Sequence, residues 1–247
     1  MAFGKVFKPP FNKVFSTPFG SAGSRVPSDV ASLNIWHDAS DATTITATGS
    51  SVDELADKQG STDLTQTGTA RPSTGVVTIN GLNAIGFDGT NDYLLNASFA
   101  VTTSCTTMHA VNVQTVTGTF ESIFSFDATN DFQVDANSNT QFLCQVNTTL
   151  FTAISGATNL EGTTFLCTVI FDFVGGTVEL RINGVSIATT SDYTTAIDTT
   201  QAYCVGVNRG LNQFLEMSFG EGLVFNAALT GADLADMESY MINKWGV

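Results

Sequence analysis

The sequence has little charge, few histidines and no paired cysteine motif. Aspartate, glutamate, lysine and arginine make up 13% of its 247 residues, and only His37 and His109 are histidines. The four cysteines show no Cys-x-x-Cys spacing, which argues against a zinc site. Their contexts are apolar and strand-like, so we expect buried, reduced thiols, with two disulfides between neighbouring strands as the alternative. They are Cys105, Cys144, Cys167 and Cys204.

Long apolar runs are also missing. No stretch approaches the length of a membrane span, and prolines and polar residues interrupt the opening residues before a secretory signal can form. We therefore expect no membrane partner and synthesis in the cytoplasm. No glycine-rich phosphate loop precedes a helix. His37 and His109 form no recognisable catalytic arrangement, and we expect both to be structural.

Basic residues are scarce and unevenly placed. Nine basic residues face 23 acidic ones, and the net charge is −14. A body this acidic should repel nucleic acid, so no nucleic-acid partner is expected. Four of the nine basic residues precede the first acidic residue, Asp29. A basic head therefore stands in front of an acidic body.

Residues 3–20, FGKVFKPPFNKVFSTPFG, repeat one eight-residue phrase and place a phenylalanine at every fourth position. Three prolines fall inside the repeat, and an interior proline costs a helix about 3 kcal/mol. We predict an extended arm over residues 1–23 that anchors the protein to a partner, in the manner of a peptide filling surface pockets. The predicted anchoring residues are Phe3, Phe7, Phe11, Phe15, Phe19, Lys5 and Lys13.

Two other interpretations of the arm stay open. It could cover an apolar groove on its own body or on a sister subunit, or it could be a disordered leader. Residues 24–31 have the composition of a hinge between this arm and a domain over 32–247.

The body alternates apolar and polar residues between closely spaced turns, and its 22 glycines and 19 phenylalanines suit many short strands. The clearest hairpin spans 163–190, with turns at Gly175-Gly176 and at Asn183-Gly184. The acidic stretch VDELAD, 52–57, indicates a short helix or loop. Besides the first strand after Leu33, other strands are expected near 76–80, 83–87, 93–97, 106–114, 120–126, 131–135, 140–147, 203–207 and 214–226.

The chain ends with a helical period. Thr230 and Asp233 form a variant of the capping box, with aspartate in place of glutamate. The spacing predicts an amphipathic helix over 230–244 that packs on the strands. Its apolar positions are Leu234, Met237, Tyr240, Met241 and Trp245.

Four segments together resemble the laminin-G-like, concanavalin-A-like jelly-roll domains: LNIWHDASDATTIT (33–46), GLNAIGFDGTNDYLL (81–95), the hairpin ending Ile182-Asn183-Gly184-Val185, and the closing GEGLVFNAALTGADLADMESYMINKWGV. The resemblance covers about residues 32–247. It implies an all-β, two-sheet antiparallel jelly-roll sandwich, with an extended N-terminal arm and a short C-terminal helix. It gives no function, because this fold carries lectins, glycosidases, adhesion modules and structural domains.

Glycosidases of this superfamily need two carboxylates that face each other across the concave sheet. No strand here carries such a run of acids, and we expect no enzymatic activity. Many relatives bind calcium, and the turns FDGTNDY and FDATND could supply ligands. Those ligands are Asp88, Asn91 and Asp92 in the first turn and Asp127, Asn130 and Asp131 in the second. The same residue types are what tight turns require, so turn formation is the preferred interpretation and no cofactor is expected.

Sugar binding calls for aromatic rings and amides on loops at the rim of the sandwich. The candidates lie in SDYTTAID and GVNRGLNQF and are Tyr193, Asn208, Arg209, Asn212 and Gln213.

Short tails rich in Phe, Pro and Lys in front of such a domain resemble those of bacteriophage virion proteins. This resemblance implies a non-enzymatic virion protein made in the host cytoplasm: a head decoration, fibre or tail component. Its arm would bind a capsid or tail protein, and its jelly roll, as a homo-oligomer, would face a host-surface glycan. The alternatives are a cellular carbohydrate- or protein-binding module and, third, a glycanase-like enzyme.

Overall fold

A computed structural model of the chain describes residues 25–247, apart from 61, 99–100, 119, 127–131, 137–140, 147–148, 155–159, 192, 194–195 and 197–201. The predicted arm and its anchoring residues therefore lie outside the described residues. Those described form seventeen strands, all paired antiparallel, and a fifteen-residue C-terminal helix, α1 (Gly231–Trp245). The predicted all-β antiparallel sandwich is confirmed.

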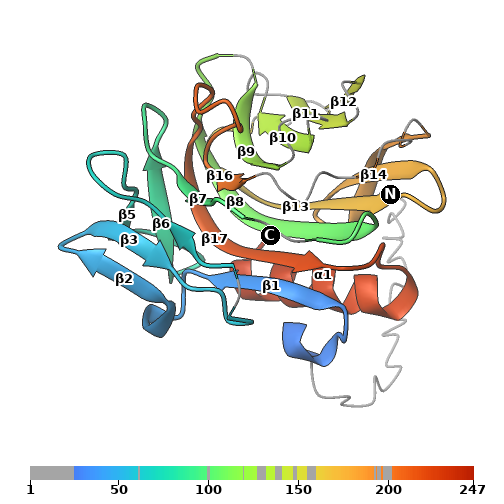
Figure 1. The fold of residues 1–247 in the computed structure, drawn as a ribbon, viewed down its shortest axis with the longest axis horizontal. Helices are drawn as coiled ribbons and strands as arrows, with labels where there is room; N and C mark the ends of the chain where they lie inside the picture. Colours follow the sequence, from blue (N-terminus) through green and yellow to red (C-terminus); the bar gives the residue numbers. More distant parts are fainter. Residues whose placement is uncertain are drawn as a thin grey trace, which may run out of the picture.

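One layer is built around the long strands β8, β13 and β17, which run side by side (Figure 1). On one side of β17 lie β8, β13 and their hairpin partners, and on its other side lie β1 and β6. The strands of this layer are β1 (Leu33–Asp38), β5 (Ser73–Ile79), β6 (Leu82–Asp88), β8 (Cys105–Thr115), β13 (Thr163–Asp172), β14 (Thr177–Ile182), β15 (Val185–Thr190) and β17 (Glu216–Phe225).

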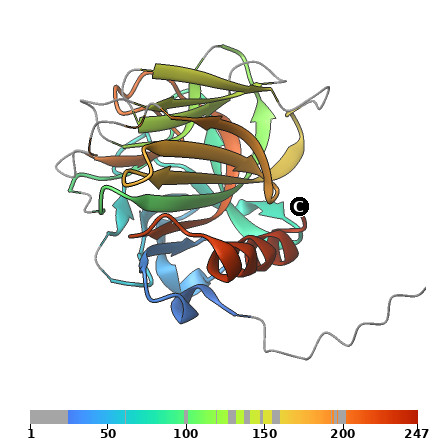
Figure 2. The same ribbon diagram turned by 90° about the vertical axis from the view of Figure 1, so that its right-hand side faces the viewer.

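The second layer continues from β3 through β4, β7, β16, β9, β10 and β11 to β12. Helix α1 lies on the opposite side of the long strands from β10–β12 (Figures 1 and 2). The strands of this layer are β2 (Ile45–Thr48), β3 (Ser51–Leu55), β4 (Leu64–Thr65), β7 (Leu94–Asn96), β9 (Glu121–Phe126), β10 (Phe132–Ala136), β11 (Gln141–Val146), β12 (Thr149–Ile154) and β16 (Tyr203–Val205).

The long strands are buried on both faces. In β8, Val111 and Val113 face the core between the two layers, whereas Met108 and Ala110 face α1. The helix contributes Met237, Met241 and Trp245, all fully buried. This confirms the predicted apolar stripe of the helix, and each such side chain removed from water contributes about 1.5–3 kcal/mol.

A bulge in β17 decides which side chains reach the helix. The register between β17 and β8 shifts between Phe219 and Glu221. Before the shift, Phe219 faces the core between the layers, and after it Leu223 faces α1. The residue in the bulge is Gly220, where an added Cβ would lie 2.7 Å from the ring of Trp245. The bulge therefore directs Glu221 toward the helix.

Two local predictions are wrong. Residues 51–55 form strand β3, where a short helix or loop was predicted. A register shift against β2 puts both Val52 and Leu55 on the buried face, and this three-residue spacing is one that a helix would also show. At the start of α1, Thr230 precedes the helix but makes no side-chain capping bond. Asp233 accepts a hydrogen bond from Arg25 Nη1 at 2.6 Å, so the pair forms no capping box.

The cysteines, the predicted hinge and the helices can each be compared with what the sequence predicts. All four cysteines are buried and unpaired, as predicted. Within the predicted hinge, Pro27–Asp29 form a short 3-10 helix and Val30 is buried against the α1 core, so this part packs on the domain. In the part of the chain that the structure describes, no helix has the length and apolarity of a membrane span.

Candidate functional site

The loop from Asn208 to Gln213 connects β16 to β17 and is shaped by one buried amide. The side chain of Asn208 accepts hydrogen bonds from the backbone N–H groups of Asn212 at 3.0 Å and Gln213 at 3.2 Å. Its Nδ2 donates to Gln213 Oε1 at 2.7 Å. Asn208 is only 8% exposed, whereas Asn212 is exposed. The loop is thus held in one shape from inside.

The neighbouring β8–β9 connection is held in a similar way. The carboxylate of Glu121 accepts hydrogen bonds from the Thr117 hydroxyl at 2.7 Å and from the Thr117 backbone N–H at 3.2 Å. Phe120, the residue before it, has a φ of 65°, in the left-handed region. Such a conformation costs a non-glycine residue of order 1–3 kcal/mol, and it is sustained only by the surrounding contacts.

These two connections are joined to each other. The Ser122 N–H donates to the Gln213 carbonyl at 3.2 Å, and the Gly206 N–H donates to the Ile123 carbonyl at 3.0 Å. Figure 1 shows both connections at the same end of the sandwich. Between them lies a hollow of about 300 Å³, here called the rim hollow. It is lined by Phe120, Gln145, Asn208, Arg209, Asn212 and Gln213.

The rim hollow brings together four of the five predicted ligand-binding residues, and their role in binding stays a prediction. Sequence reasoning missed Phe120 and Gln145, because they come from a turn and from β11, far apart in the chain from the predicted loop. An aromatic ring, amides and a guanidinium offer packing surface and hydrogen-bond donors and acceptors to a polar ligand. Among the described residues that line it, none carries a carboxylate.

The fifth candidate, Tyr193, is not an exposed rim residue. It is 1% exposed, and its hydroxyl donates to the Thr103 carbonyl. Its ring meets those of Phe171 and Phe173 edge-on, at centroid distances of 6.1 and 5.5 Å. The expectation that Tyr193 presents a ring to a ligand is therefore wrong: a buried tyrosine in a strand-rich core satisfies its hydroxyl on a backbone carbonyl.

The calcium candidates near residue 88 form a turn. Asp88 Oδ1 accepts the backbone N–H groups of Thr90, Asn91 and Asp92 at 2.8 to 3.2 Å, and these bonds outweigh the effect of burial and lower the pKa of Asp88. Burial, together with the charge of Asp88, raises the pKa of Asp92 to about 6. Among the described residues, no three side chains of His, Cys, Asp or Glu are grouped to hold a metal ion. The second predicted turn, with Asp127, Asn130 and Asp131, lies outside them.

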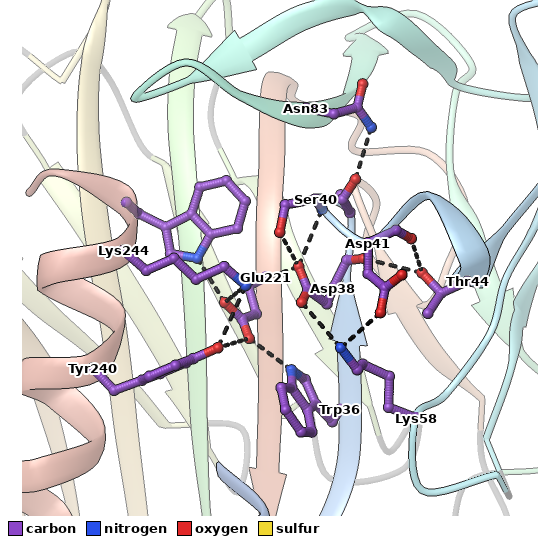
Figure 3. A network of polar contacts seen from close by, with 12 residues as sticks. Trp36, Asp38, Ser40, Asp41, Thr44, Lys58, Asn83, Glu221, Tyr240 and Lys244 are labelled. Atoms are coloured by element: carbon purple, nitrogen blue, oxygen red, sulfur yellow. Dashed lines mark hydrogen bonds and ion pairs between the residues drawn. The ribbon is translucent and has the colours of Figure 1, made fainter. Parts of the chain in front are cut away.

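Sequence reasoning also missed a pair of carboxylates that do face each other. Asp38 of β1 pairs in register with Glu221 of β17, beneath α1 (Figure 3). Lys244 Nζ lies between them, 2.9 Å from Asp38 Oδ1 and 2.8 Å from Glu221 Oε2. The two acids come from segments 183 residues apart, so no local spacing could reveal them.

Glu221 is fully buried, and its carboxylate is surrounded by hydrogen-bond donors. It accepts hydrogen bonds from Trp36 Nε1 at 2.6 Å, Trp245 Nε1 at 2.7 Å and the Tyr240 hydroxyl at 3.0 Å. Burial and the adjacent Asp38 raise the pKa of Glu221, against the opposing effect of Lys244. We refer to Glu221, Asp38 and their partners as the buried network. Its hydrogen bonds and ion pairs join helix α1 to strands β1 and β17.

Asp38 has a second cation. Lys58 Nζ lies 3.3 Å from Asp38 Oδ2 and 2.9 Å from Asp41 Oδ2, over the ring of Trp36. Burial alone would raise the pKa of Asp38, but the Ser40 hydroxyl and the two lysines lower it overall. Asp38 is therefore held between two lysines in a largely buried ion-pair cluster.

The histidines lie deep in the core. His109 Nε2 is 2.6 Å from the Tyr203 hydroxyl, and its ring stacks on Phe124. His37 Nε2 is 2.7 Å from the Thr62 carbonyl. Burial lowers the pKa of both, and that of His109 falls to about 3. Both side chains are fully buried and part of the packing, which agrees with the structural role expected of them.

Several solved structures share this fold at low sequence identity. Domain 4 of AbnA, a GH43 extracellular arabinanase from Geobacillus stearothermophilus in complex with arabinotriose, aligns with a TM-score of 0.60 and 14% identity, covering 83% of this chain and 97% of that one. The binding domain of Paraclostridial Mosquitocidal Protein 1 aligns with a TM-score of 0.64 and 12% identity, covering 89% and 53%.

Trypanosoma rangeli sialidase aligns with a TM-score of 0.62 and 10% identity over 87% of this chain, which spans about 33% of the length of that enzyme. At these identities the likeness extends to the fold alone. No curated protein sequence matches the chain. The model of the concanavalin A-like lectin/glucanases superfamily matches residues 88–235, more than half of the sequence. The chain therefore belongs to the concanavalin A-like lectin/glucanases superfamily.

Proposed function

We propose that this chain is a non-enzymatic glycan-binding protein of a bacteriophage particle, with the saccharide bound in the rim hollow. The observation that carries the binding role is the lining of that hollow. It combines the strained Phe120 of the β8–β9 connection with Arg209 and with side-chain amides from the β16–β17 loop and from Gln145 of β11. Functional pockets combine an apolar surface with a few convergent polar groups, and strain gathers at such sites.

The rim hollow suits one or two sugar units. Its volume, about 300 Å³, is at the lower end of the usual range for ligand pockets. The ring of Phe120 offers apolar surface for the C–H face of a sugar, and Asn212 offers both a donor and an acceptor to hydroxyl groups. The amide of Asn208 holds the loop before any ligand arrives, which reduces the entropy lost on binding.

The proposed function is non-enzymatic because the two facing acids, Asp38 and Glu221, are both bound by Lys244 within the buried network. A retaining glycosidase needs two carboxyl groups about 5 Å apart that both reach the substrate. Glu221 is fully buried, and Lys244 is bound to both acids. In support of a binding role, the arabinanase domain of the same fold is known in complex with arabinotriose.

The virion assignment rests on residues 1–23. Their repeated phenylalanines, prolines and lysines suit attachment of the domain to a capsid or tail protein. The domain would then face outward, in several copies, on a particle assembled in the host cytoplasm. The second candidate, a cellular carbohydrate- or protein-binding module, makes use of the same hollow and differs only in what the arm binds.

A panel of immobilised glycans tests the binding role. The variant is Phe120→Gly, which removes the ring and relieves the positive φ. The matched control is Leu211→Gly, which removes an exposed apolar side chain, also at positive φ (53°), from the same rim but outside the lining. We expect the wild type and the control to bind the same glycans, and Phe120→Gly to bind at least tenfold more weakly. A wild type that binds no glycan, or a variant that binds as the wild type does, would refute the proposal.

Turnover separates binding from catalysis. The protein is incubated with each glycan that it binds, and the amount of reducing ends released is measured. The same measurement is made with the Glu221→Gln variant for comparison. We expect no release above that of buffer. Multiple turnovers that depend on Glu221 would make the chain a glycanase.

A further inference from the structure

The buried network holds an amine against a carboxyl group. Lys244 Nζ of α1 lies 2.9 Å from Oδ1 of Asp38 in β1, and the carboxyl carbon, Cγ, is one bond beyond that oxygen (Figure 3). The orientation of Asp38 is fixed, because the hydroxyl and the backbone N–H of Ser40 donate to the same oxygen at 2.6 and 3.1 Å. Reacting groups that a fold holds in contact behave as if their local concentration were very high. The fold therefore presents a nucleophile and an electrophile to each other from positions 206 residues apart.

A third group contacts the same amine. Glu221 Oε2 lies 2.8 Å from Lys244 Nζ, and the pairing of β17 with β1 puts Glu221 opposite Asp38. The amine therefore contacts two carboxyl groups. Burial and the charge of Asp38 raise the pKa of Glu221, against the effect of Lys244. A carboxyl group with a raised pKa is suited to take up a proton and return it within one reaction. An amine, a carboxyl carbon and a proton carrier are what the condensation of an amine with an acid requires.

Lys58 completes the arrangement at the other oxygen of Asp38. Its Nζ lies 3.3 Å from Asp38 Oδ2, where negative charge gathers when an amine attacks Cγ, and a fixed cation stabilises such a charge. Lys58 Nζ also lies 2.9 Å from Asp41 Oδ2. Hydrogen bonds from Thr43 and Lys58 lower the pKa of Asp41 to about 2, so Asp41 stays ionised and holds Lys58 as a cation. The lysine beside Asp41 is therefore suited to stabilise charge, and the lysine beside Glu221 to react.

We propose that the side chains of Lys244 and Asp38 condense to an amide bond, with Glu221 as the proton carrier. One ammonium proton passes to Asp38 Oδ1, and the neutral amine attacks Cγ and forms the C–N bond, which leaves a negative charge on Oδ2. A second proton passes from the nitrogen to Glu221 Oε2 and on to the Oδ1 hydroxyl, the C–Oδ1 bond breaks, and one water molecule leaves. The electron pair on Oδ2 restores the carbonyl, and Glu221 returns to its starting state. The reaction consumes no oxidant or cofactor, and it does not depend on the proposed glycan-binding function.

The surroundings of the three groups suit such a bond. The indoles of Trp36 and Trp245 and the phenol of Tyr240 donate to Glu221 and enclose the network beneath α1. Exclusion of bulk water favours the loss of a water molecule and protects the product from hydrolysis. The bond would join the first strand of the described domain to its C-terminal helix. A cross-link that closes so long a loop restricts the unfolded chain and thereby favours the folded one.

Peptide mass spectrometry of the full-length wild type tests the bond directly. The protein is reduced, denatured and digested. We expect the peptides that contain residues 38 and 244 to be joined, with a mass lower by one water molecule than their sum. The undigested chain should also migrate ahead of the Asp38→Ala variant on a denaturing gel with reductant, because a closed loop keeps it compact. Separate peptides of full mass would overturn the inference. A loss of water confined to the Asp38 peptide would overturn it too, because that loss indicates a cyclised aspartate.

Variants assign the role of each group. Lys244→Arg and Asp38→Ala each remove a bond-forming group, and neither should give the joined peptide. Glu221→Gln keeps the size of the side chain but cannot carry the proton, and its joined fraction should fall by about a hundredfold or more after equal incubation. The matched control is Glu238→Gln. Glu238 is also buried between α1 and the strands, but it is bound by Arg181 Nε at 2.8 Å in a separate ion pair, so this variant should keep the joined peptide in full.

The outcomes separate a covalent bond from an ion pair. A purely structural ion pair lowers the melting temperature of these variants but gives no joined peptide in the wild type. Melting curves establish which variants are folded before their peptides are compared. If Glu221→Gln does not fold, the wild-type digest and Lys244→Arg decide. A folded Glu221→Gln that is joined as fully as the wild type would refute the role of Glu221 as proton carrier. Glycan binding is measured separately, and its failure would leave the bond untouched.

Discussion

The buried network and the rim hollow both combine polar groups with aromatic rings, but one is buried and the other is open to water. Beneath α1, Glu221 is fully buried and accepts from two indoles, a phenol and an ammonium group. At the rim, Asn212 is exposed and Arg209 is half-buried beside an aromatic ring. The comparison teaches that polar chemistry alone does not mark a functional site. What matters is whether the polar groups remain exposed to water, as Asn212 does, or are fully buried, as Glu221 is.

The difference has an energetic basis. A charge removed from water must recover its hydration free energy from partners, so a buried carboxylate persists only in a complete set of hydrogen bonds. Such a set leaves nothing for a ligand. A rim group keeps part of its contact with water and can exchange that water for a sugar hydroxyl. The buried network is therefore expected to govern stability, and the rim hollow to govern binding.

The largest expected effect comes from Glu221→Gln. The substitution removes the charge that Lys244 and the indoles surround, and breaking a buried ion pair on one side costs about 3–5 kcal/mol. For a chain of this size each kcal/mol lowers the melting temperature by about 2–4 °C. Calorimetry should therefore show a loss of about 6–20 °C. The control is Glu216→Gln, in the same strand but only partly buried, which should change the melting temperature little.

This result also bears on the rim hollow. At a temperature where Glu221→Gln remains folded, its glycan affinity should equal that of the wild type. A variant that keeps its stability but loses glycan binding would reverse the comparison and make the buried network the functional site.

The second effect is on acid stability and arises from His37 and His109. Their pKa values are lowered in the folded state, so unfolding releases neutral rings that take up protons below about pH 6.5. The stabilisation is complete above that pH and is lost as the pH falls toward the folded pKa. Each histidine then lowers the free energy of unfolding by about 1.4 kcal/mol per pH unit. Urea unfolding at pH 7, 6 and 5 measures this slope.

Asp92 acts in the opposite direction in the same range. Its folded pKa is raised to about 6, so the stability that it contributes is present at low pH and lost as the pH rises through 6. In Asp92→Asn the acid-induced loss of stability should therefore be steeper than in the wild type. In His109→Gln it should be shallower. A slope that neither variant changes would mean that other groups titrate in this range.

The strands were predictable where burial follows a simple alternation. The hairpin over 163–190 folds as predicted, with Asn183 at a φ of 50° and Gly184 at 77° in its tight turn. The sequence pattern failed at the bulge in β2–β3, because one extra residue converts the alternation of a strand into a three-residue spacing. An Asn-Gly turn is determined by the two residues themselves, so it can be predicted locally. The position of a bulge is determined by pairing with another strand, so it cannot.

The candidate site was predictable only in its contiguous part. Asn208, Arg209, Asn212 and Gln213 lie within one loop, and a run of amides around a glycine is visible in the sequence. Phe120 reaches the hollow through the pairing of β9 with β16, and Gln145 through the pairing of β9 with β10 and of β10 with β11. These pairings are long-range information that a local sequence pattern does not contain. The misassigned Tyr193 shows the limit of the same reasoning: its neighbours in sequence are polar, but its ring packs in the core.

A smaller effect on stability is expected at Asn208, which is buried and also lines the rim hollow. Asn208→Ala removes three side-chain hydrogen bonds inside the loop, and leaving buried groups without partners costs about 1–3 kcal/mol. It should also weaken glycan binding, because the hollow loses its shape. Asn212→Ala is the matched control: it is exposed and should change stability by less than about 0.5 kcal/mol while still weakening binding. Equal stability losses in the two variants would contradict the assigned roles.

The smallest effect on stability is expected from deleting residues 1–23. The described domain has its own core, and Arg25, which stays in the truncated protein, binds Asp233 at 2.6 Å and Asp236 at 3.2 Å on α1. The melting temperature should change by less than about 2 °C. Arg25→Gln, at an exposed ion pair, should have a similarly small effect.

Attachment should respond quite differently from stability. Each phenylalanine that enters a pocket contributes about 1.5–3 kcal/mol, while ordering the backbone costs about 1–2 kcal/mol per residue. Aromatic burial therefore does not suffice alone, and the arm needs backbone hydrogen bonds as well, such as those of a strand added to the edge of a partner's sheet. The double variant Phe7→Ala and Phe11→Ala should join particles at least tenfold less well than the wild type, as measured by sedimentation with the particles. Normal incorporation of the truncated protein would refute the anchor, and failure of the truncated protein to fold would place the aromatic residues in its own core.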